Sequence, residues 1–288
     1  MTVFAFAQQQ EPAQALATEL GTACSIVECH RFPDGESCIQ IEPELIADSC
    51  VVYASLVQPD NITLPLFFLA HTLRDYGVQH ITLVAPYLAY MRQDKIFKSG
   101  QGVTARYYAR LLSSCFDKLV TVDPHLHRIH DLADIYSIET KLVRAAPAVS
   151  NWLKANVSSP VIIGPDSESA QWVKKLAKNS GAPFLVLEKT RRGDRDVEVI
   201  VPQVEKWTDC TPVLFDDIIS TGKTMIETIK HLLAAGLSAP VCIGIHAVFA
   251  DAAWQQIKQA GAARVVTCNT IPHASNCIDL SQVLAINI

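Results

Sequence analysis

The sequence lacks the features that mark several large classes of protein. It has no basic leader before its first apolar stretch and no run of about 18 apolar residues, so we expect neither a signal peptide nor a spanning helix. Its nine cysteines contain no Cys-x-x-Cys pair and are better explained as reduced thiols than as a disulfide framework. The net charge of −5 provides no general attraction to nucleic acid or to anionic lipid. We therefore expect a cytoplasmic protein in which a local basic site binds any anionic substrate.

The sequence does contain a repeated alternation of short apolar runs and amphipathic stretches. Of its 288 residues, 49% are hydrophobic, which is enough for a substantial core. The expected strands are residues 49–56, 80–85, 118–122, 160–164, 183–187, 212–215, 240–247 and 263–268. The expected helices are residues 64–76, 103–113, 167–179, 224–235 and 251–260. This alternation predicts an α/β fold with mainly parallel sheets flanked by helices.

Two similar domains are expected because the halves of the sequence repeat the same order of signals. In the first half a helix ends at Gly77 and a strand follows, and in the second half a helix ends at Gly236 and a strand follows. A glycine after a helix commonly adopts a left-handed cap. We predict an N-terminal domain over residues 1–145 and a C-terminal domain over residues 146–288.

The strongest local signal lies in residues 212–224, where an apolar strand leads through two carboxylates into a short turn and a helix. Backbone N–H groups at a helix N-terminus bind phosphate, and hydroxyl side chains add donors. Asp216 and Asp217 can accept hydrogen bonds from sugar hydroxyls. Phosphate donors beside paired acceptors describe a pocket for a sugar phosphate. The turn that would hold the phosphate consists of Ser220, Thr221, Gly222, Lys223 and Thr224.

The Gly-Lys-Thr of this turn invites comparison with the Walker A motif of nucleotide-binding P-loops. That motif requires a glycine five residues before Gly222, and position 217 is Asp. An ordinary P-loop is therefore disfavoured. A simple N-capped turn without a ligand is the bland alternative to a sugar phosphate loop.

A turn between residues 31 and 36 carries groups suited to a nucleobase. Phe32 can stack on a base, and Asp34 and Glu36 can accept from an exocyclic amine. Taken alone, the segment also fits a Pro-Asp-Gly turn with flanking charges.

Polar residues follow the expected strand 80–85. Arg92 is a fixed cation suited to phosphate, and Gln93 and Asp94 add polar contacts. Loops at the carboxyl ends of parallel strands are favoured ligand positions. The alternative is a solvated charged loop.

Three histidines follow the expected strand 118–122. His125, His127 and His130 lie close to Asp123 in the sequence. No cysteine or further ligand completes a zinc site, so a role beside Mg²⁺ and phosphate is the better hypothesis. Ordinary surface histidines are the alternative.

A dense run of charge occupies residues 188–195 and contains Lys189, Arg191 and Gly193. Between two apolar segments, such a run predicts a flexible cationic flap. A solvated charged hairpin is the alternative.

Taken together and in this order, these segments resemble phosphoribosyl pyrophosphate synthetase, a member of the type I phosphoribosyltransferase fold, and its shorter archaeal-type branch in particular. The resemblance covers nearly the whole chain. It implies two phosphoribosyltransferase-like domains, the first with the ATP segments and the second with the ribose 5-phosphate loop. The implied catalytic residues are Lys189, Arg191 and His125. The implied ATP contacts are Phe32, Asp34, Glu36, Arg92, Gln93 and Asp94. The implied Mg²⁺ residues are His125 and Asp166.

The resemblance also implies a reaction. The enzyme would transfer the diphosphoryl group of ATP to the C1 hydroxyl of ribose 5-phosphate with Mg²⁺ as cofactor. Adenine would be bound across subunits, so a homodimer or a larger homo-oligomer is expected. The rivals are a phosphoribosyltransferase, which would lack the adenine segments, and a catalytically silent regulatory subunit, which would have lost residues of the flap or the metal site.

Overall fold

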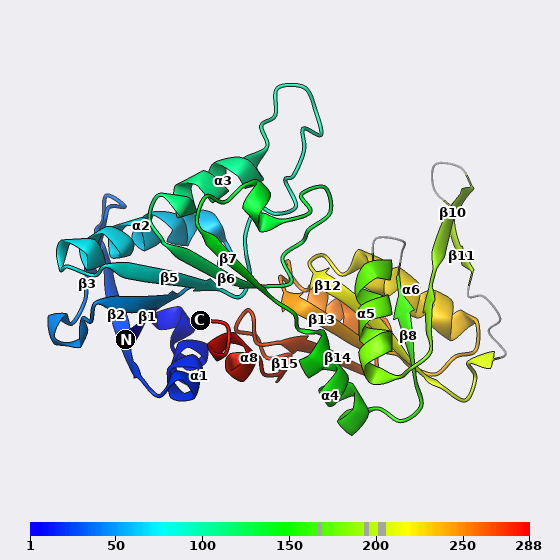
Figure 1. Ribbon diagram of the computed structural model, residues 1–288. Helices are drawn as coiled ribbons and strands as arrows, with labels where there is room; N and C mark the ends of the chain where they lie inside the picture. The colour runs from blue at the N-terminus through cyan, green and yellow to red at the C-terminus, as the bar shows by residue number, and fades with distance from the viewer. Residues whose placement is uncertain (166–168, 193–195, 201–205) are drawn as a thin grey trace. The chain divides into compact units, whose positions relative to one another are not determined.

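The computed structural model describes residues 1–165, 169–192, 196–200 and 206–288, with the backbone path alone between 188 and 200. The chain divides into two compact units (Figure 1): Met1–Val143 together with Leu280–Ile288, and Arg144–Asp279. The sequence assigned everything after residue 145 to the second domain, yet Leu280–Ile288 lies in the first unit. The cause is a short helix, α8 (Ser281–Ala285), which packs against the first unit's α1 (Gln10–Leu20) and has Leu284 buried.

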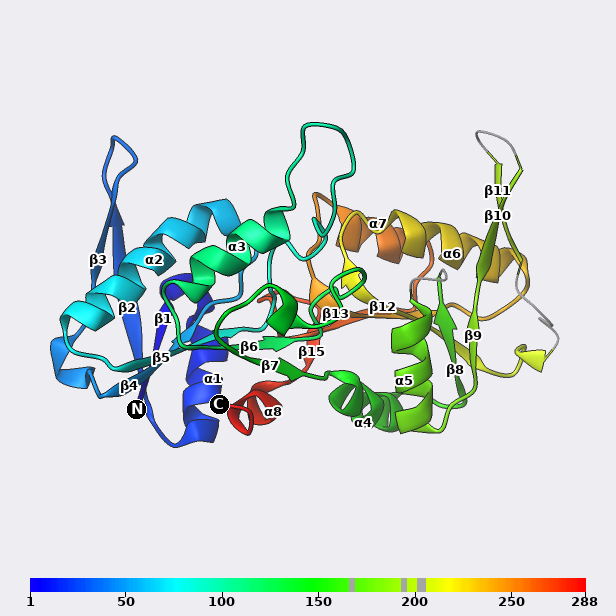
Figure 2. The same cartoon turned by 45° about the horizontal axis from the view of Figure 1, so that its top comes forward.

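The first unit is built on a sheet with the strand order β3-β2-β1-β4-β5-β6-β7. Its strands are β1 (Thr2–Phe6), β2 (Ala23–Arg31), β3 (Ser37–Gln40), β4 (Ser49–Tyr53), β5 (His80–Ala85), β6 (Lys118–Val122) and β7 (Glu139–Val143). All pairings are parallel except β2 with β3. Helices α2 (Pro59–Asp75) and α3 (Thr104–Ser113) cover one face, and α1 and α8 cover the other (Figure 2).

The central strands of this sheet are buried on both faces, which explains their continuous apolar sequences. Because side chains alternate along a strand, Phe4 of β1, Val52 of β4 and Leu83 of β5 share one core with Leu69 of α2 and Leu112 of α3.

The second unit is built on a parallel sheet with the order β15-β14-β13-β12-β8-β9 and a separate antiparallel hairpin, β10-β11. Its strands are β8 (Pro160–Gly164), β9 (Phe184–Val186), β10 (Glu188–Arg192), β11 (Asp196–Ile200), β12 (Thr211–Ile219), β13 (Val241–Ala247), β14 (Arg264–Cys268) and β15 (Asn276–Ile278). Its helices are α4 (Ala146–Asn156), α5 (Ala170–Ser180), α6 (Lys223–Ala234) and α7 (Ala253–Gln259). Helices α4 and α5 lie on one face, and α6 and α7 on the other (Figure 2).

The two units share one strand order. Numbering the parallel strands of each unit along the chain gives second-first-third-fourth-fifth-sixth in both sheets. In both units an antiparallel segment follows the second parallel strand: β3 in the first unit and the β10-β11 hairpin in the second. The order reverses between β1 and β4 in the first sheet and between β8 and β12 in the second. The carboxyl ends of the strands at such a reversal form the usual ligand site of an open α/β sheet.

The α/β fold with two similar domains is therefore confirmed. The expected left-handed glycines are present, with φ of 90° at Gly77 and 82° at Gly236. Two elements differ from expectation. Helix α2 begins at Pro59 rather than at residue 64, because proline is favoured at the first helical position. Residues 188–192, expected in a flexible loop, form β10 and pair with β11.

No helix in the described ranges is long and apolar enough to cross a membrane.

Candidate active site

The predicted sugar phosphate loop joins β12 to α6 in the second unit. Helix α6 begins with Gly222 as its N-cap, and no side-chain cap satisfies its first turn within the described residues. The first turn of any helix has N–H groups without intrahelical acceptors. A backbone hydrogen bond holds the loop in place, since the Ala250 N–H donates to the Ser220 carbonyl at 3.2 Å. The helix N-terminus is therefore held open toward an external acceptor of negative charge.

Glycine is required at two positions around this loop. Gly222 has φ of 70°, and a Cβ there would lie 2.9 Å from Cδ1 of Ile257. A Cβ on Gly244, which pairs with Asp216 across β12 and β13, would lie 2.7 Å from Ile219. Both contacts are shorter than carbon atoms tolerate, so the backbone near the carboxylates packs closely.

The paired carboxylates occupy the last part of β12. Asp217 is only 4% exposed, and its Oδ1 accepts the Ile218 N–H at 2.9 Å. Asp216 is half-buried, and its Oδ1 accepts the Asp217 N–H at 3.0 Å. These bonds fix both carboxylates immediately before the phosphate loop. Each carboxylate has capacity to accept further hydrogen bonds, as a sugar diol requires.

Strand β8 reaches the same edge of the sheet beside β12. Its last residue, Gly164, admits α5 closely, because a Cβ there would lie 2.4 Å from the Ser169 hydroxyl oxygen. Three predicted residues lie wholly or partly outside what the structure describes. Asp166 lies outside the described residues, and the side chains of Lys189 and Arg191 lie outside them as well, although the backbones of both are in β10.

In the first unit, the turn predicted to bind a base lies at the tip of the β2-β3 hairpin. Gly35 has φ of 94°, and the Phe32 N–H donates to the Glu36 carbonyl at 2.8 Å. Asp34 accepts the Glu36 N–H at 3.1 Å. Phe32 is 44% exposed, and its ring meets the His30 ring edge-to-face at 4.5 Å. The structure thus presents an accessible aromatic surface beside two carboxylates.

The loop after β5 contains Arg92, Gln93 and Asp94. Arg92 and Gln93 are exposed, but the Asp94 side chain is 3% exposed. It accepts from the Arg128 backbone N–H at 3.2 Å and pairs with the Arg128 guanidinium at 3.1 Å. Asp94 therefore ties this loop to the segment after β6. Sequence reasoning missed Arg128, whose signal was a cation three residues beyond His125.

A hydrogen bond at Tyr90 anchors the same loop. Tyr90 has a left-handed backbone, with φ of 62°, and its hydroxyl donates to the Asp60 carboxylate near the start of α2. This bond and partial burial raise the pKa of Tyr90 to about 12. The Tyr90 ring also packs on Tyr108 with centroids 4.7 Å apart. Arg92 and Gln93 thus extend from a rigid base.

The histidine segment follows β6 directly. His125 is half-buried, and its ring stacks with that of His127 at 6.4 Å between centroids. Across the described ranges, no group of three or more His, Cys, Asp or Glu is arranged to hold a metal ion. A transition metal needs such a cage, whereas Mg²⁺ uses one or two protein ligands with water and substrate phosphates. Of the two residues predicted to hold Mg²⁺, His125 lies within the described residues, and a Mg²⁺ held mainly by substrate phosphates and water would need few protein ligands.

The first unit brings some predicted residues together and separates others. Asp94 and the segment of His125 are joined through Arg128. The Phe32 turn follows β2, whereas Arg92 follows β5, and β1 and β4 lie between these strands. With about 4.8 Å between neighbouring strands, the two loops start roughly 14 Å apart. A base stacked on Phe32 would therefore not contact Arg92 of the same chain.

Comparison with known proteins agrees with these features. Residues 1–115 match the N-terminal domain of ribose phosphate pyrophosphokinase, and residues 132–282 match the phosphoribosyl transferase domain. The chain is 30% identical to ribose-phosphate pyrophosphokinase of Sulfolobus acidocaldarius over 88% of both chains. It is 28% identical to that of Methanobrevibacter smithii over 96% of both.

A solved structure supports the fold. Phosphoribosylpyrophosphate synthetase from Mycobacterium smegmatis superimposes with a TM-score of 0.86 at 23% identity, covering 99% of this chain and 96% of that one. The two domain matches and the archaeal relatives extend this likeness from fold to family. The chain belongs to the ribose-phosphate pyrophosphokinase family.

Proposed function

We propose that this chain is a ribose-phosphate diphosphokinase, which transfers the diphosphoryl group of ATP to ribose 5-phosphate for nucleotide biosynthesis. The observation that carries the proposal is the loop after β12, where an uncapped helix N-terminus adjoins two fixed carboxylates. Family membership selects this reaction over others that use such a loop.

Ribose 5-phosphate binds at this loop. The phosphate accepts from the N–H groups and hydroxyls of the turn, and the α6 dipole favours its charge. Asp216 and Asp217 accept hydrogen bonds from the ribose hydroxyls. The turn residues are Ser220, Thr221, Gly222, Lys223 and Thr224.

ATP is held by the loops of the first unit. Arg92 and Gln93 contact its phosphates, and Asp94 positions them through its bonds to Arg128. The adenine stacks on Phe32 and is read by Asp34 and Glu36 of a neighbouring subunit. The working unit is therefore a homodimer or a larger homo-oligomer.

Mg²⁺ bound together with the substrate phosphates would neutralise their charge. His125 and Asp166 are the protein groups that would hold it. Lys189 and Arg191, carried on the β10-β11 hairpin, stabilise the negative charge that develops on the transferred group.

In the reaction, the C1 hydroxyl oxygen of ribose 5-phosphate attacks the β-phosphorus of ATP. A new oxygen–phosphorus bond forms, and the bond from the β-phosphorus to the oxygen shared with the α-phosphorus breaks. AMP leaves with that oxygen, and the hydroxyl proton is released. The residues above contribute mainly by alignment and electrostatics.

The test is AMP release from ATP and Mg²⁺, with and without ribose 5-phosphate, alongside Lys189→Ala. Equal amounts of AMP and phosphoribosyl pyrophosphate, formed only with the sugar and largely lost in the variant, would support the proposal. Well-folded protein that forms no sugar-dependent AMP, with or without added phosphate, would instead indicate a regulatory subunit or a phosphoribosyltransferase.

A further inference from the structure

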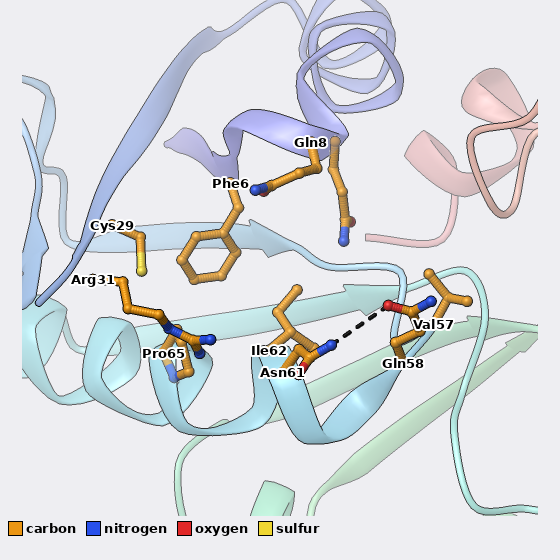
Figure 3. Close-up of a pocket in the computed structure, with 10 residues that line it drawn as sticks. Phe6, Gln8, Cys29, Arg31, Val57, Gln58, Asn61, Ile62 and Pro65 are labelled. Atoms are coloured by element: carbon orange, nitrogen blue, oxygen red, sulfur yellow. Dashed lines mark hydrogen bonds between the residues drawn. The ribbon is translucent and has the colours of Figure 1, made fainter. Parts of the chain in front are cut away.

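A pocket of about 550 Å³ opens in the first unit at the carboxyl ends of β1 and β4 (Figure 3). Pockets of this size suit small organic ligands. It includes Phe6 from the end of β1, Arg31 from the end of β2, and Gln58 and Asn61 at the start of α2. The loops proposed to hold ATP phosphates and ribose 5-phosphate contribute none of its described wall.

The pocket occupies the position in the first unit that the sugar phosphate loop occupies in the second. Strands β1 and β4 are the counterparts of β8 and β12, because both pairs lie where the shared strand order reverses. The helix that follows the third parallel strand has a left-handed N-cap in both units: Gln58 with φ of 50°, and Gly222 with φ of 70°. A non-glycine residue held in this conformation costs about 1–2 kcal/mol. The first unit thus has the same left-handed backbone before this helix as the second unit, despite that cost.

The floor of the pocket is held in place by Gln9. Its side-chain amide donates to the Ser55 carbonyl at 2.9 Å and accepts the Ser55 N–H at 2.5 Å. These two bonds join the segment after β1 to the segment after β4. The pocket is therefore preformed.

The chemistry of this pocket differs from that of the sugar phosphate loop. None of its described lining residues is a carboxylate, and the charge it carries is the guanidinium of Arg31. Within the described residues, that guanidinium makes no hydrogen bond or ion pair with a protein group. The pocket also holds the carboxamides of Gln8, Gln58 and Asn61, with Asn61 donating weakly to Gln58 at 3.5 Å.

The apolar side of the pocket suits a flat group. Phe6 lies between the Arg31 side and the Gln58 side in Figure 3, and Ile62 lies below it. Carboxamides pair with the donor and acceptor edges of purines, and guanidinium groups bind phosphate.

We propose that this pocket binds a purine nucleoside monophosphate, with its phosphate on Arg31 and its base against Phe6 within reach of the carboxamides. No described lining residue is acidic, so none of them opposes the anion or accepts from sugar hydroxyls as Asp216 and Asp217 would in the second unit.

Cys29 supplies a direct readout. Its sulfur lines the pocket, and Cys38 on β3 is also exposed but does not line it. The rate of alkylation of each thiol is measured by mass spectrometry in wild-type protein against rising AMP. We expect AMP to slow alkylation of Cys29 severalfold and to leave Cys38 unchanged. Inorganic phosphate and ribose 5-phosphate, tested in parallel, should protect Cys29 much less.

Variants separate this pocket from other nucleotide sites. Arg31→Gln should raise the AMP concentration for half-protection at least about tenfold, because a charge-assisted bond is lost. Lys141→Gln, which removes an exposed cation on β7 at the opposite edge of the sheet, should not change it. Asn61→Leu should reduce the preference for AMP over ribose 5-phosphate. Phe32→Ala should leave protection intact.

Several results would overturn the inference. These are no slowing at Cys29 in millimolar AMP, protection that survives Arg31→Gln, equal protection by inorganic phosphate, and protection abolished by Phe32→Ala. The assay does not depend on catalysis, so an inactive protein would refute the proposed reaction without affecting this result.

Discussion

The close packing of Gly222 leads to a quantitative prediction for substitution by alanine. Two separate costs act at this position: the left-handed backbone, and a Cβ that would lie 2.9 Å from Ile257. The first costs about 1–2 kcal/mol and the second, as overpacking, about 1–3 kcal/mol. Gly222→Ala should therefore destabilise the second unit by about 2–5 kcal/mol.

Two other glycines separate these costs. Gly236, at the far end of α6, has φ of 82° but open space where an added methyl group would lie, so Gly236→Ala should show the backbone cost alone. Gly244 has no positive φ but a Cβ position 2.7 Å from Ile219, so Gly244→Ala should show the packing cost alone.

Tryptophan fluorescence in urea is a suitable assay, because Trp152, Trp172, Trp207 and Trp254 all lie in the second unit. With a slope of about 2 kcal/mol per molar urea, Gly222→Ala should lower the midpoint by roughly 1–2.5 M. Its KM for ribose 5-phosphate should rise as well, which Gly236→Ala should not cause. If the midpoints of Gly222→Ala and Gly236→Ala coincided, the contact with Ile257 would not constrain the loop, and the reasoning would fail.

Three other side chains offer independent tests. Asp94→Asn should cost about 1 kcal/mol, since Arg128 is 42% exposed and can be resolvated, and should raise the KM for ATP; unchanged thermal unfolding and KM would contradict the positioning role. Gln9→Leu should destabilise the first unit by about 2–4 kcal/mol and speed amide exchange at Ser55; unchanged exchange there would show that the two bonds are dispensable. Burial lowers the pKa of His273, so the unfolded chain binds more protons just below pH 6.5 and stability should fall as pH falls through that value. An NMR titration of His273 at or above 6.5, or the same pH dependence in His273→Asn, would refute this.

The strands that were predicted correctly from the sequence are those with continuous apolar runs. Strands β5, β6 and β8 were predicted with the bounds that the structure has, because each is an apolar run rich in branched residues. Strand β7 was missed because its partly exposed edge position allows Glu139 and Lys141 to interrupt the apolar pattern. Strand β15 was missed because its three residues begin with a polar Asn276 and form no continuous apolar run.

In the candidate site, groups that are adjacent in the chain were predicted from the sequence, whereas pairs that are distant in the chain were not. The loop from Asp216 into α6 was recognisable because its groups are adjacent in the chain. The bond between Asp94 and Arg128 joins residues 34 positions apart, and that between Gln9 and Ser55 joins residues 46 apart. Such pairs depend on which strands become neighbours, and local pattern does not determine that. The pocket beside Arg31 likewise combines residues from the ends of β1, β2 and α2, which are far apart in the chain.

The position of α8 has a consequence for how the protein is made. The first unit needs Leu280–Ile288, both for the packing of α8 on α1 and for the bond from the Lys118 ammonium to the Ile288 carbonyl at 3.1 Å. On the ribosome, those residues follow the whole second unit, and synthesis at about 5–20 residues per second separates the two by on the order of ten seconds. During that interval the surface of α1 that α8 later covers stays exposed. The second unit acquires its full sequence at Asp279, before Leu280–Ile288 is made. The later-made unit can therefore complete its fold first, which reverses the usual order of folding along a nascent chain.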